Sequence, residues 1–149
     1  MIEGRKMGSN SKERIVKIIL PNMIGYERIA MASLASFAKM FDYSPERIED
    51  LKTIVSEAVI NAMQHGNRER PDSVVTVHLN FEEDTIQILV MDEGDGIKEV
   101  PSKPNIERVI NQLEPPTGFG VFLIQKLADE MEFNIDTDKG HGLRIVAKK

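Results

Sequence analysis

Two helices are predicted in the first half of the chain from the spacing of its apolar residues. Between Ile24 and Phe41 these residues recur every three or four positions and form one narrow stripe, made of Ala30, Leu34, Phe37 and Phe41. A second helix is predicted to begin at Ser44-Pro45, because serine can cap a helix and proline fits its first position. The connection between them is short, so we expect antiparallel or nearly antiparallel neighbours. The second helix has a core face of Ile48, Leu51, Val55, Ala58, Val59 and Ala62.

Alternating apolar residues predict strands before and after these helices. Residues 13–20 mix β-branched and charged residues and stop at Pro21, which is typical of an edge strand. Every second residue is apolar in 75–81 and again in 86–90, with a turn at 82–84 between them. The pattern of residues 133–147 predicts a last antiparallel pair joined by a hairpin turn at 139–142.

A third helix is predicted between the two pairs of strands. It opens at Thr117-Gly118-Phe119-Gly120 and continues to about Asp129. The residues expected on its packing face are Val121, Ile124, Leu127 and Ala128. The preceding segment, 98–117, contains four prolines, and a long irregular insertion of this kind is usually a functional lid or a disordered segment.

Composition narrows the class of protein. The 149 residues are expected to form one domain, with 41% hydrophobic and 29% charged residues as in ordinary globular proteins. No apolar run is long enough to cross a bilayer, and a net charge of -5 without a basic cluster disfavours direct nucleic-acid binding. The chain has no cysteine, which excludes disulfides and thiol chemistry and fits a reducing cytoplasm. The opening Met-Ile-Glu-Gly-Arg is typical of a protease recognition site left by recombinant expression, so residues 1–6 are set apart from an expected domain of 7–149.

Two polar residues of the second helix lie outside its apolar stripe. Glu57 and Asn61 are four positions apart, which places them about 40° from one another around the helix axis. A carboxylate and an amide at this spacing could hold a hydrated cation and accept a proton from a hydroxyl group. An isolated pair of this kind is more often part of a solvated face. The helix is expected to end at residues 65–67, with Gly66 in the left-handed conformation that closes the last turn.

The carboxylate of Asp92 is predicted to lie at the end of the strand that contains residues 86–90. The alternation of Ile86, Ile88 and Val90 brings Asp92 onto the apolar face, where a carboxylate needs a hydrogen-bond partner. The alternative is that the strand has already ended and Asp92 starts a turn.

Glycines follow at two places where backbone could approach a ligand. Gly94 and Gly96 would let the chain come close to a flat ligand, or simply form a turn. Gly118 and Gly120 would expose backbone amides at a helix start, which suits a phosphate chain, or would merely make the helix entry flexible.

The order of these signals resembles that of a known superfamily. The order Glu57-x-x-x-Asn61, Asp92-x-Gly94-x-Gly96 and Gly118-x-Gly120 is similar to that of the ATP-binding domain shared by gyrase, Hsp90, the MutL repair protein and histidine kinases, the GHKL superfamily. Residues 56–62 with His65-Gly66, and residues 120–130, resemble most closely the bacterial anti-sigma factor serine kinases of sporulation and stress-response partner switching.

The resemblance implies roles for the site residues. Asp92 would accept a hydrogen bond from the adenine amine, Asn61 would ligate Mg²⁺, and Glu57 would take the proton from an incoming serine hydroxyl. The remaining ATP-binding positions would be Gly94, Gly96, Ile97, Thr117, Gly118, Phe119, Gly120 and Val121, with residues 98–117 as the ATP lid. His65 is expected to cap or pack, and His78 and His141 to be exposed.

The resulting prediction is an α/β (α+β) two-layer sandwich of the Bergerat type. A mixed, mostly antiparallel sheet would be covered on one face by about three helices. Its function would be that of an ATP- and Mg²⁺-dependent protein-serine kinase and anti-sigma factor, which phosphorylates a small STAS-like antagonist and sequesters a sigma factor. It would act in the cytoplasm, as a homodimer, without direct contact to nucleic acid or membrane. The alternative is a nucleotide-binding partner-switch module or coactivator of the same fold with little or no kinase activity.

Overall fold

A computed structural model of the chain describes residues 14–94, 119–138 and 140–149. Its first part contains β1 (Val16–Pro21), α1 (Glu27–Met40), α2 (Pro45–Asn61) and the π-helical turn η2 (Ala62–Gly66). The second part contains β2 (Val74–Glu82), β3 (Thr85–Met91), α4 (Phe119–Leu127), β4 (Glu130–Asp136) and β5 (His141–Lys148). The expected lid at 98–117, and Gly96, Ile97, Thr117 and Gly118, lie outside the described residues.

The strands form one five-stranded sheet in the order β1-β2-β3-β5-β4. β1 lies at one edge, which confirms the edge strand expected from its charges and its closing proline. All four pairings of neighbouring strands are antiparallel. The predicted two-layer α+β fold with a mostly antiparallel sheet is confirmed. The parallel pairing implied by a mixed sheet does not occur among the described strands, because β2–β3 and β4–β5 are hairpins and the pairings β1–β2 and β3–β5 are antiparallel as well.

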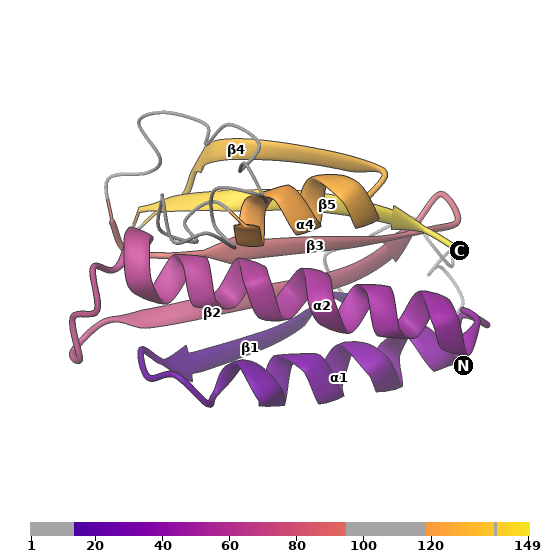
Figure 1. Ribbon diagram of the computed structural model, residues 1–149, viewed down its shortest axis with the longest axis horizontal. Coiled ribbons are helices and arrows are strands. Elements are labelled where there is room, and N and C mark those ends of the chain that lie inside the picture. Colours follow the sequence, from indigo (N-terminus) through magenta and orange to yellow (C-terminus); the bar gives the residue numbers. More distant parts are fainter. Residues whose placement is uncertain (1–13, 95–118, 139) are drawn as a thin grey trace, which may run out of the picture.

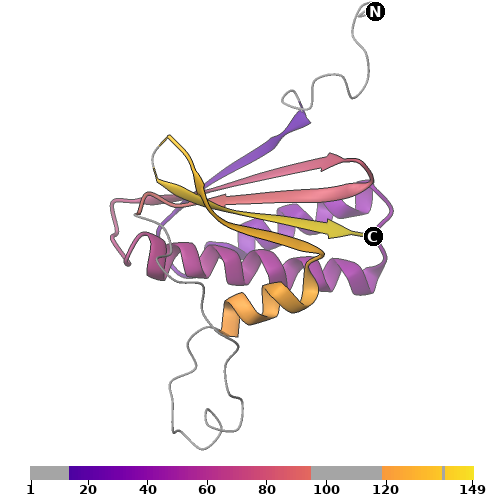
Figure 2. The ribbon, with the colours of Figure 1, turned by 90° about the horizontal axis from the view of Figure 1, so that it is seen from above.

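The three helices cover one face of this sheet, as predicted (Figures 1 and 2). Alternation along the strands sends one set of side chains into the core beneath the helices, for example Val77, Val90 and Ile145 at 2% exposure or less. The helices contribute their predicted stripes, with Leu34, Leu51 and Ile124 fully buried. None of the helices in the described ranges is long and apolar enough to cross a membrane.

The N-terminus of α2 is built as its first residues suggest. The Ser44 side chain accepts a hydrogen bond of 3.1 Å from the Arg47 amide, and Pro45 occupies the first turn. The Arg47 guanidinium then reaches the C-terminal end of α4, donating to Leu127 O at 2.7 Å and to Asp129 Oδ2 at 2.8 Å. The end of α4 is thereby tied to the start of α2, so the two helices run antiparallel and the start of α4 lies near the end of α2.

Tyr43 joins two strands at the other end of the sheet from the candidate site. Its hydroxyl donates to Ala147 O at 2.6 Å and accepts from the Ile86 amide at 2.9 Å, and burial raises the pKa of this phenol. We expect Tyr43→Phe to lower the free energy of unfolding by about 1–3 kcal/mol, because both backbone groups lose a buried partner. Urea denaturation measures this loss, and Tyr26→Phe is the control because Tyr26 is 37% exposed. Equal stability of the two variants would contradict the bridge.

Candidate nucleotide-binding site

Glu57 and Asn61 lie together on the last turns of α2, against the start of α4. A methyl group at Gly120 would be 2.8 Å from Glu57 Oε2 and 3.2 Å from Asn61 Nδ2. The backbone of the second residue of α4 therefore packs directly on the acid and the amide, and a larger residue there would displace them. This explains a glycine at position 120 by close approach, in addition to any role in exposing amides.

The Glu57 carboxylate is partly buried, and the Asn61 amide has a donor without a hydrogen-bond partner in the described ranges. Burial raises the pKa of Glu57, and no hydrogen bond or charge from the described residues opposes this effect. Asn61 Nδ2 is buried and has no hydrogen-bond partner within the described part of the chain. A half-buried carboxylate beside an unsatisfied amide is the kind of arrangement that a polar ligand completes.

Asp92 follows β3 directly and is held by its own turn. Its amide donates to His141 O at 2.9 Å, and its Oδ1 accepts from the Gly94 amide at 2.8 Å. Burial raises the pKa of the Asp92 carboxyl, an effect that the Gly94 hydrogen bond and the nearby His141 partly offset. The strand ends at Met91, so Asp92 does start a turn, which is the alternative interpretation. Its carboxylate is nevertheless desolvated, as the alternation of β3 predicts.

Gly66 serves a different purpose from the one expected. It is not in the left-handed conformation; among the described glycines only Gly25 has a positive φ, and Arg68 and Glu69 take the left-handed positions. The helix does not close in a glycine turn because its last turn widens into η2, where the Asn67 amide bonds to Ala62 O at 2.7 Å. A side chain at Gly66 would instead collide with the Asp92 carboxylate, so this glycine is required by the close approach of β3.

The predicted residues thus fall into two groups along one helical segment. Glu57, Asn61 and Gly120 form the first, and Asp92 with Gly94 packs on Gly66 in the second. In Figure 1 the ends of α2 and β3 lie on the same side of the molecule. Val121 is 4% exposed, so its side chain belongs to the core. Phe119 begins α4.

Two residues near Asp92 were not expected to matter. His141, expected to be exposed, is half-buried, with Nδ1 3.1 Å from Gly94 O and Nε2 3.3 Å from Asp136 Oδ1. Asn67 is completely buried, and its Oδ1 accepts from the Glu93 amide at 2.7 Å. The one signal for Asn67 in the sequence is an amide placed directly after a helix end, where side chains often bond to backbone.

Few donor atoms for a metal ion are gathered in the part of the chain that the structure describes. No cluster of three or more His, Asp or Glu side chains capable of holding a metal occurs in the described ranges. Mg²⁺ on a nucleotide needs fewer protein ligands, because phosphate oxygens and water complete its shell. Asn61 and Glu57, which converge on Gly120, offer one amide and one carboxylate and fit that limited role.

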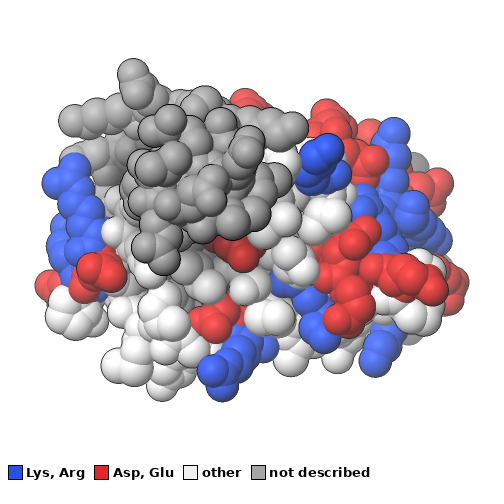
Figure 3. Space-filling model, viewed as in Figure 1, with Lys and Arg blue, Asp and Glu red and all other residues white. Residues whose placement is uncertain are grey.

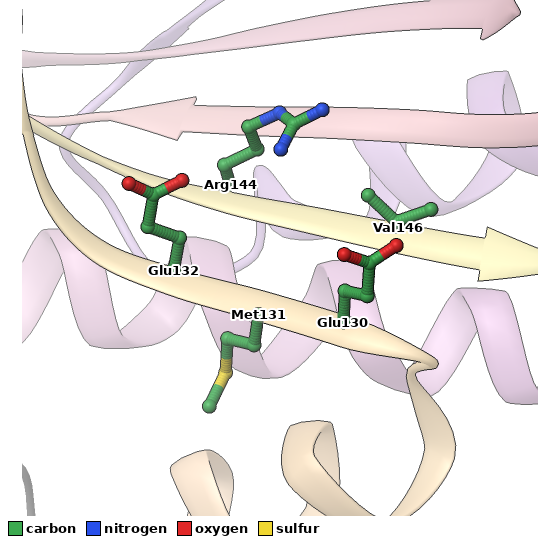
Figure 4. Close-up of a pocket in the computed structure, with 5 residues that line it drawn as sticks. All are labelled: Glu130, Met131, Glu132, Arg144 and Val146. Carbon is green, nitrogen blue, oxygen red and sulfur yellow. The ribbon is translucent and has the colours of Figure 1, made fainter.

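The small hollow seen in Figure 4 is unrelated to these groups. The residues that line it are Glu130, Met131, Glu132, Arg144 and Val146; the side chain of Met131 points toward the helices, and the other four lie on the opposite face of the sheet. None of the candidate site residues belongs to it.

Comparison with known proteins gives these groups a context. Residues 20–147 match the family described as histidine kinase-like ATPase domain. Among similar curated proteins are the anti-sigma F factors of Clostridium beijerinckii, 32% identical with 83% of this chain and 85% of that protein covered, and of Clostridium acetobutylicum, 35% identical with 83% and 84% covered. The serine-protein kinase RsbW of Oceanobacillus iheyensis is 31% identical, with 90% of this chain and 85% of that protein covered.

A solved structure supports the same fold. The crystal structure of the RsbU and RsbW domains of a Mycobacterium tuberculosis protein aligns with a TM-score of 0.62 and 18% identity, over 90% of this chain and 32% of that one. At this identity the likeness concerns the fold alone. Since the family match extends over nearly all of the sequence and the relatives are similar along most of their length, the chain belongs to the histidine kinase-like ATPase domain family.

Proposed function

We propose that this protein is an ATP-dependent protein-serine kinase and anti-sigma factor. It phosphorylates a serine of a small STAS-like antagonist protein and, when not engaged with that antagonist, sequesters a sigma factor in the cytoplasm. The names of the relatives, anti-sigma F factor and serine-protein kinase RsbW, support both halves of this proposal.

The observation that carries the proposal is the position of the Glu57 carboxylate. It lies against the start of α4, beside Asn61, and burial raises its pKa. A general base works best when its pKa approaches the operating pH, so desolvation makes Glu57 a better proton acceptor than an exposed glutamate. Nucleotide binding alone would not need a base at this place.

The proposed reaction follows from these groups. The serine Oγ forms a bond to the γ-phosphorus as the bond from that phosphorus to the oxygen of ADP breaks, and the serine proton passes to Glu57. Asp92 would receive the exocyclic amine of adenine, and the amides around Gly120 would bind phosphate oxygens. Mg²⁺, held through Asn61 and the phosphates, would neutralise the charge of the phosphate chain.

Transfer of labelled phosphate tests the function. The purified protein is incubated with γ-labelled ATP and with small antagonist proteins encoded near its gene, and the product is mapped by mass spectrometry. We expect phosphoserine at one position of one antagonist. Tight binding of Mg·ATP without transfer to any of them would favour the nucleotide-binding partner-switch module instead.

We also propose that the protein is a homodimer. Six large apolar side chains, here called the edge patch, are exposed by 37–69% on β1, the β1–α1 connection and the start of α1: Val16, Ile19, Met23, Ile24, Tyr26 and Ile29. Uncharged atoms make up much of the surface at the lower left of Figure 3, where the β1–α1 connection lies in the same view of Figure 1. An edge strand flanked by apolar side chains can pair with its own copy about a two-fold axis, which would bury the patch.

Sedimentation measures the oligomeric state. We expect a dimer for the wild type and a monomer for Ile19→Glu/Met23→Glu, because each copy would bring two charges into the contact. Met40→Glu is the control, since Met40 is 71% exposed at the opposite end of α1. A monomeric wild type, or a dimer that survives the double substitution, would contradict the proposed interface.

A further inference from the structure

A buried amide joins three segments of the chain next to the candidate site. Asn67 has no exposed surface and follows η2 directly. Its Oδ1 accepts from the Glu93 amide at 2.7 Å, and its Nδ2 donates to Val74 O at 2.8 Å and to Asn22 Oδ1 at 3.1 Å. A buried side chain with this many partners has one conformation available, so it fixes the distance between the segments it joins.

Glu93, the residue after Asp92, is held at three points. Besides the bond of its amide to Asn67, its carbonyl accepts from Arg70 Nη2 at 3.2 Å and its Oε1 accepts from the Val74 amide at 2.7 Å. The Arg70 Nε donates in turn to Asn67 O at 2.9 Å. Asn67, Arg70 and Glu93, here called the clasp, therefore bind the turn after β3 to the end of the long helical segment.

The clasp acts where two backbones are in very close contact. A side chain at Gly94 would collide with Gly66 O, and one at Gly66 would collide with the Asp92 carboxylate. Because the two backbones are so close, a small displacement of the turn after β3 would cause a steric clash, and hydrogen bonds must hold this turn in place. Burial opposes the charge of Asp92, and within its own turn one hydrogen bond, from the Gly94 amide at 2.8 Å, holds the carboxylate.

We infer that Asn67 is a positioning residue for nucleotide recognition. Through the clasp, Asn67 holds the Asp92 carboxylate at a fixed distance from the face of α2 that carries Glu57 and Asn61. This distance would match the span between the adenine and the phosphates of one nucleotide. This inference rests on the proposed function, because it assigns the base to Asp92. The clasp is expected to act on affinity and base selectivity through Asp92, without contacting the nucleotide itself.

Selectivity for the base separates positioning from a purely structural role. The full-length protein is titrated by calorimetry with Mg·ADP and with Mg·IDP, which carries an oxygen where adenine has the amine that Asp92 would accept from. We expect the wild type to prefer ADP, and Asn67→Ala to bind ADP about tenfold more weakly with the ADP/IDP ratio moving toward one. A loss of stability alone would weaken both nucleotides equally and leave the ratio unchanged.

A second variant covers the case in which Asn67→Ala does not fold. Arg70→Lys keeps the positive charge near Asp92 but loses the two-pronged link from Asn67 O to Glu93 O, and we expect a smaller change of the ratio in the same direction. Asn80→Ala is the matched control, because Asn80 lies on β2 and has one weak side-chain bond of 3.4 Å, to Glu82. A wild-type ADP/IDP ratio retained by both Asn67→Ala and Arg70→Lys, or by Arg70→Lys if the first variant is unfolded, would overturn the inference. Absence of ADP binding by the wild type would instead refute the proposed function.

Discussion

Glu57→Gln is expected to lower the rate of phosphate transfer by about 10²–10⁴-fold while leaving the affinity for Mg·ATP nearly unchanged. The amide fills the same space against Gly120 but cannot take a proton at neutral pH. Single-turnover transfer to the antagonist measures the rate, and calorimetry measures the affinity. Glu49→Gln is the control, because Glu49 lies on the same helix, is 71% exposed and pairs with Lys52. A mutant that transfers phosphate at the wild-type rate would remove Glu57 from its role.

The same carboxylate is expected to determine the acid side of the pH profile. As the proposed base, Glu57 must be deprotonated, and burial raises its pKa. The transfer rate should therefore fall on acidification at a pH above that expected for an exposed glutamate, and this limb should disappear in Glu57→Gln. A limb that persists unchanged in the mutant would have to come from another group.

Asp92→Asn is expected to separate binding from stability. Asparagine has one acceptor oxygen, which is expected to stay with the Gly94 amide, so its NH2 group would face the proposed adenine amine, donor against donor. The affinity for ADP should therefore fall by about 1–3 kcal/mol, that is, about fivefold to more than a hundredfold. Calorimetric titration measures the loss. A mutant that binds ADP as the wild type does would overturn the assignment of Asp92 to adenine.

The nucleotide-free Asp92→Asn variant should be more stable at neutral pH. Burial raises the pKa of Asp92 in the folded protein, so the folded state favours the protonated carboxyl. The stabilising effect of the protonated Asp92 carboxyl is present below the pKa of Asp92 in the unfolded chain. It is lost as the pH rises through the higher pKa of Asp92 in the folded protein, so the buried charge is destabilising at neutral pH. Thermal unfolding without ligand checks this sign. Asp84→Asn, in the β2–β3 turn at the opposite end of β3, is the control, since asparagine also accepts its φ of 60°.

Much of the fold could be predicted because each element carries its own periodicity. The buried face of β3, Ile86, Ile88 and Val90, follows directly from alternation, and that alternation also leads to Asp92. The face of α2 follows from helical spacing, which in turn sets Glu57 and Asn61 apart. These patterns are local, so they survive in the sequence without knowledge of tertiary contacts.

The rest depends on contacts between distant segments. The pairing of β3 with β5 brings Asp92 beside His141, 49 positions later, and no spacing rule marks such a pair. The same holds for Asn67, whose importance comes from Glu93 and Asn22 rather than from its neighbours in the chain. The sequence predicts a helix terminator at Gly66 because glycine commonly has that role, whereas the Asp92 carboxylate packed against it is visible only in three dimensions.

The acid and amide of α2, the aspartate after β3 and the glycine at the start of α4 are proposed to bind one nucleotide together. A titration of the ¹⁵N-labelled protein with Mg·ADP, followed by NMR, tests this most directly. The backbone amides of Asn61, Gly94 and Gly120 should shift together and give a single dissociation constant. Shifts at one of these places without the others, or different dissociation constants for them, would contradict the claim.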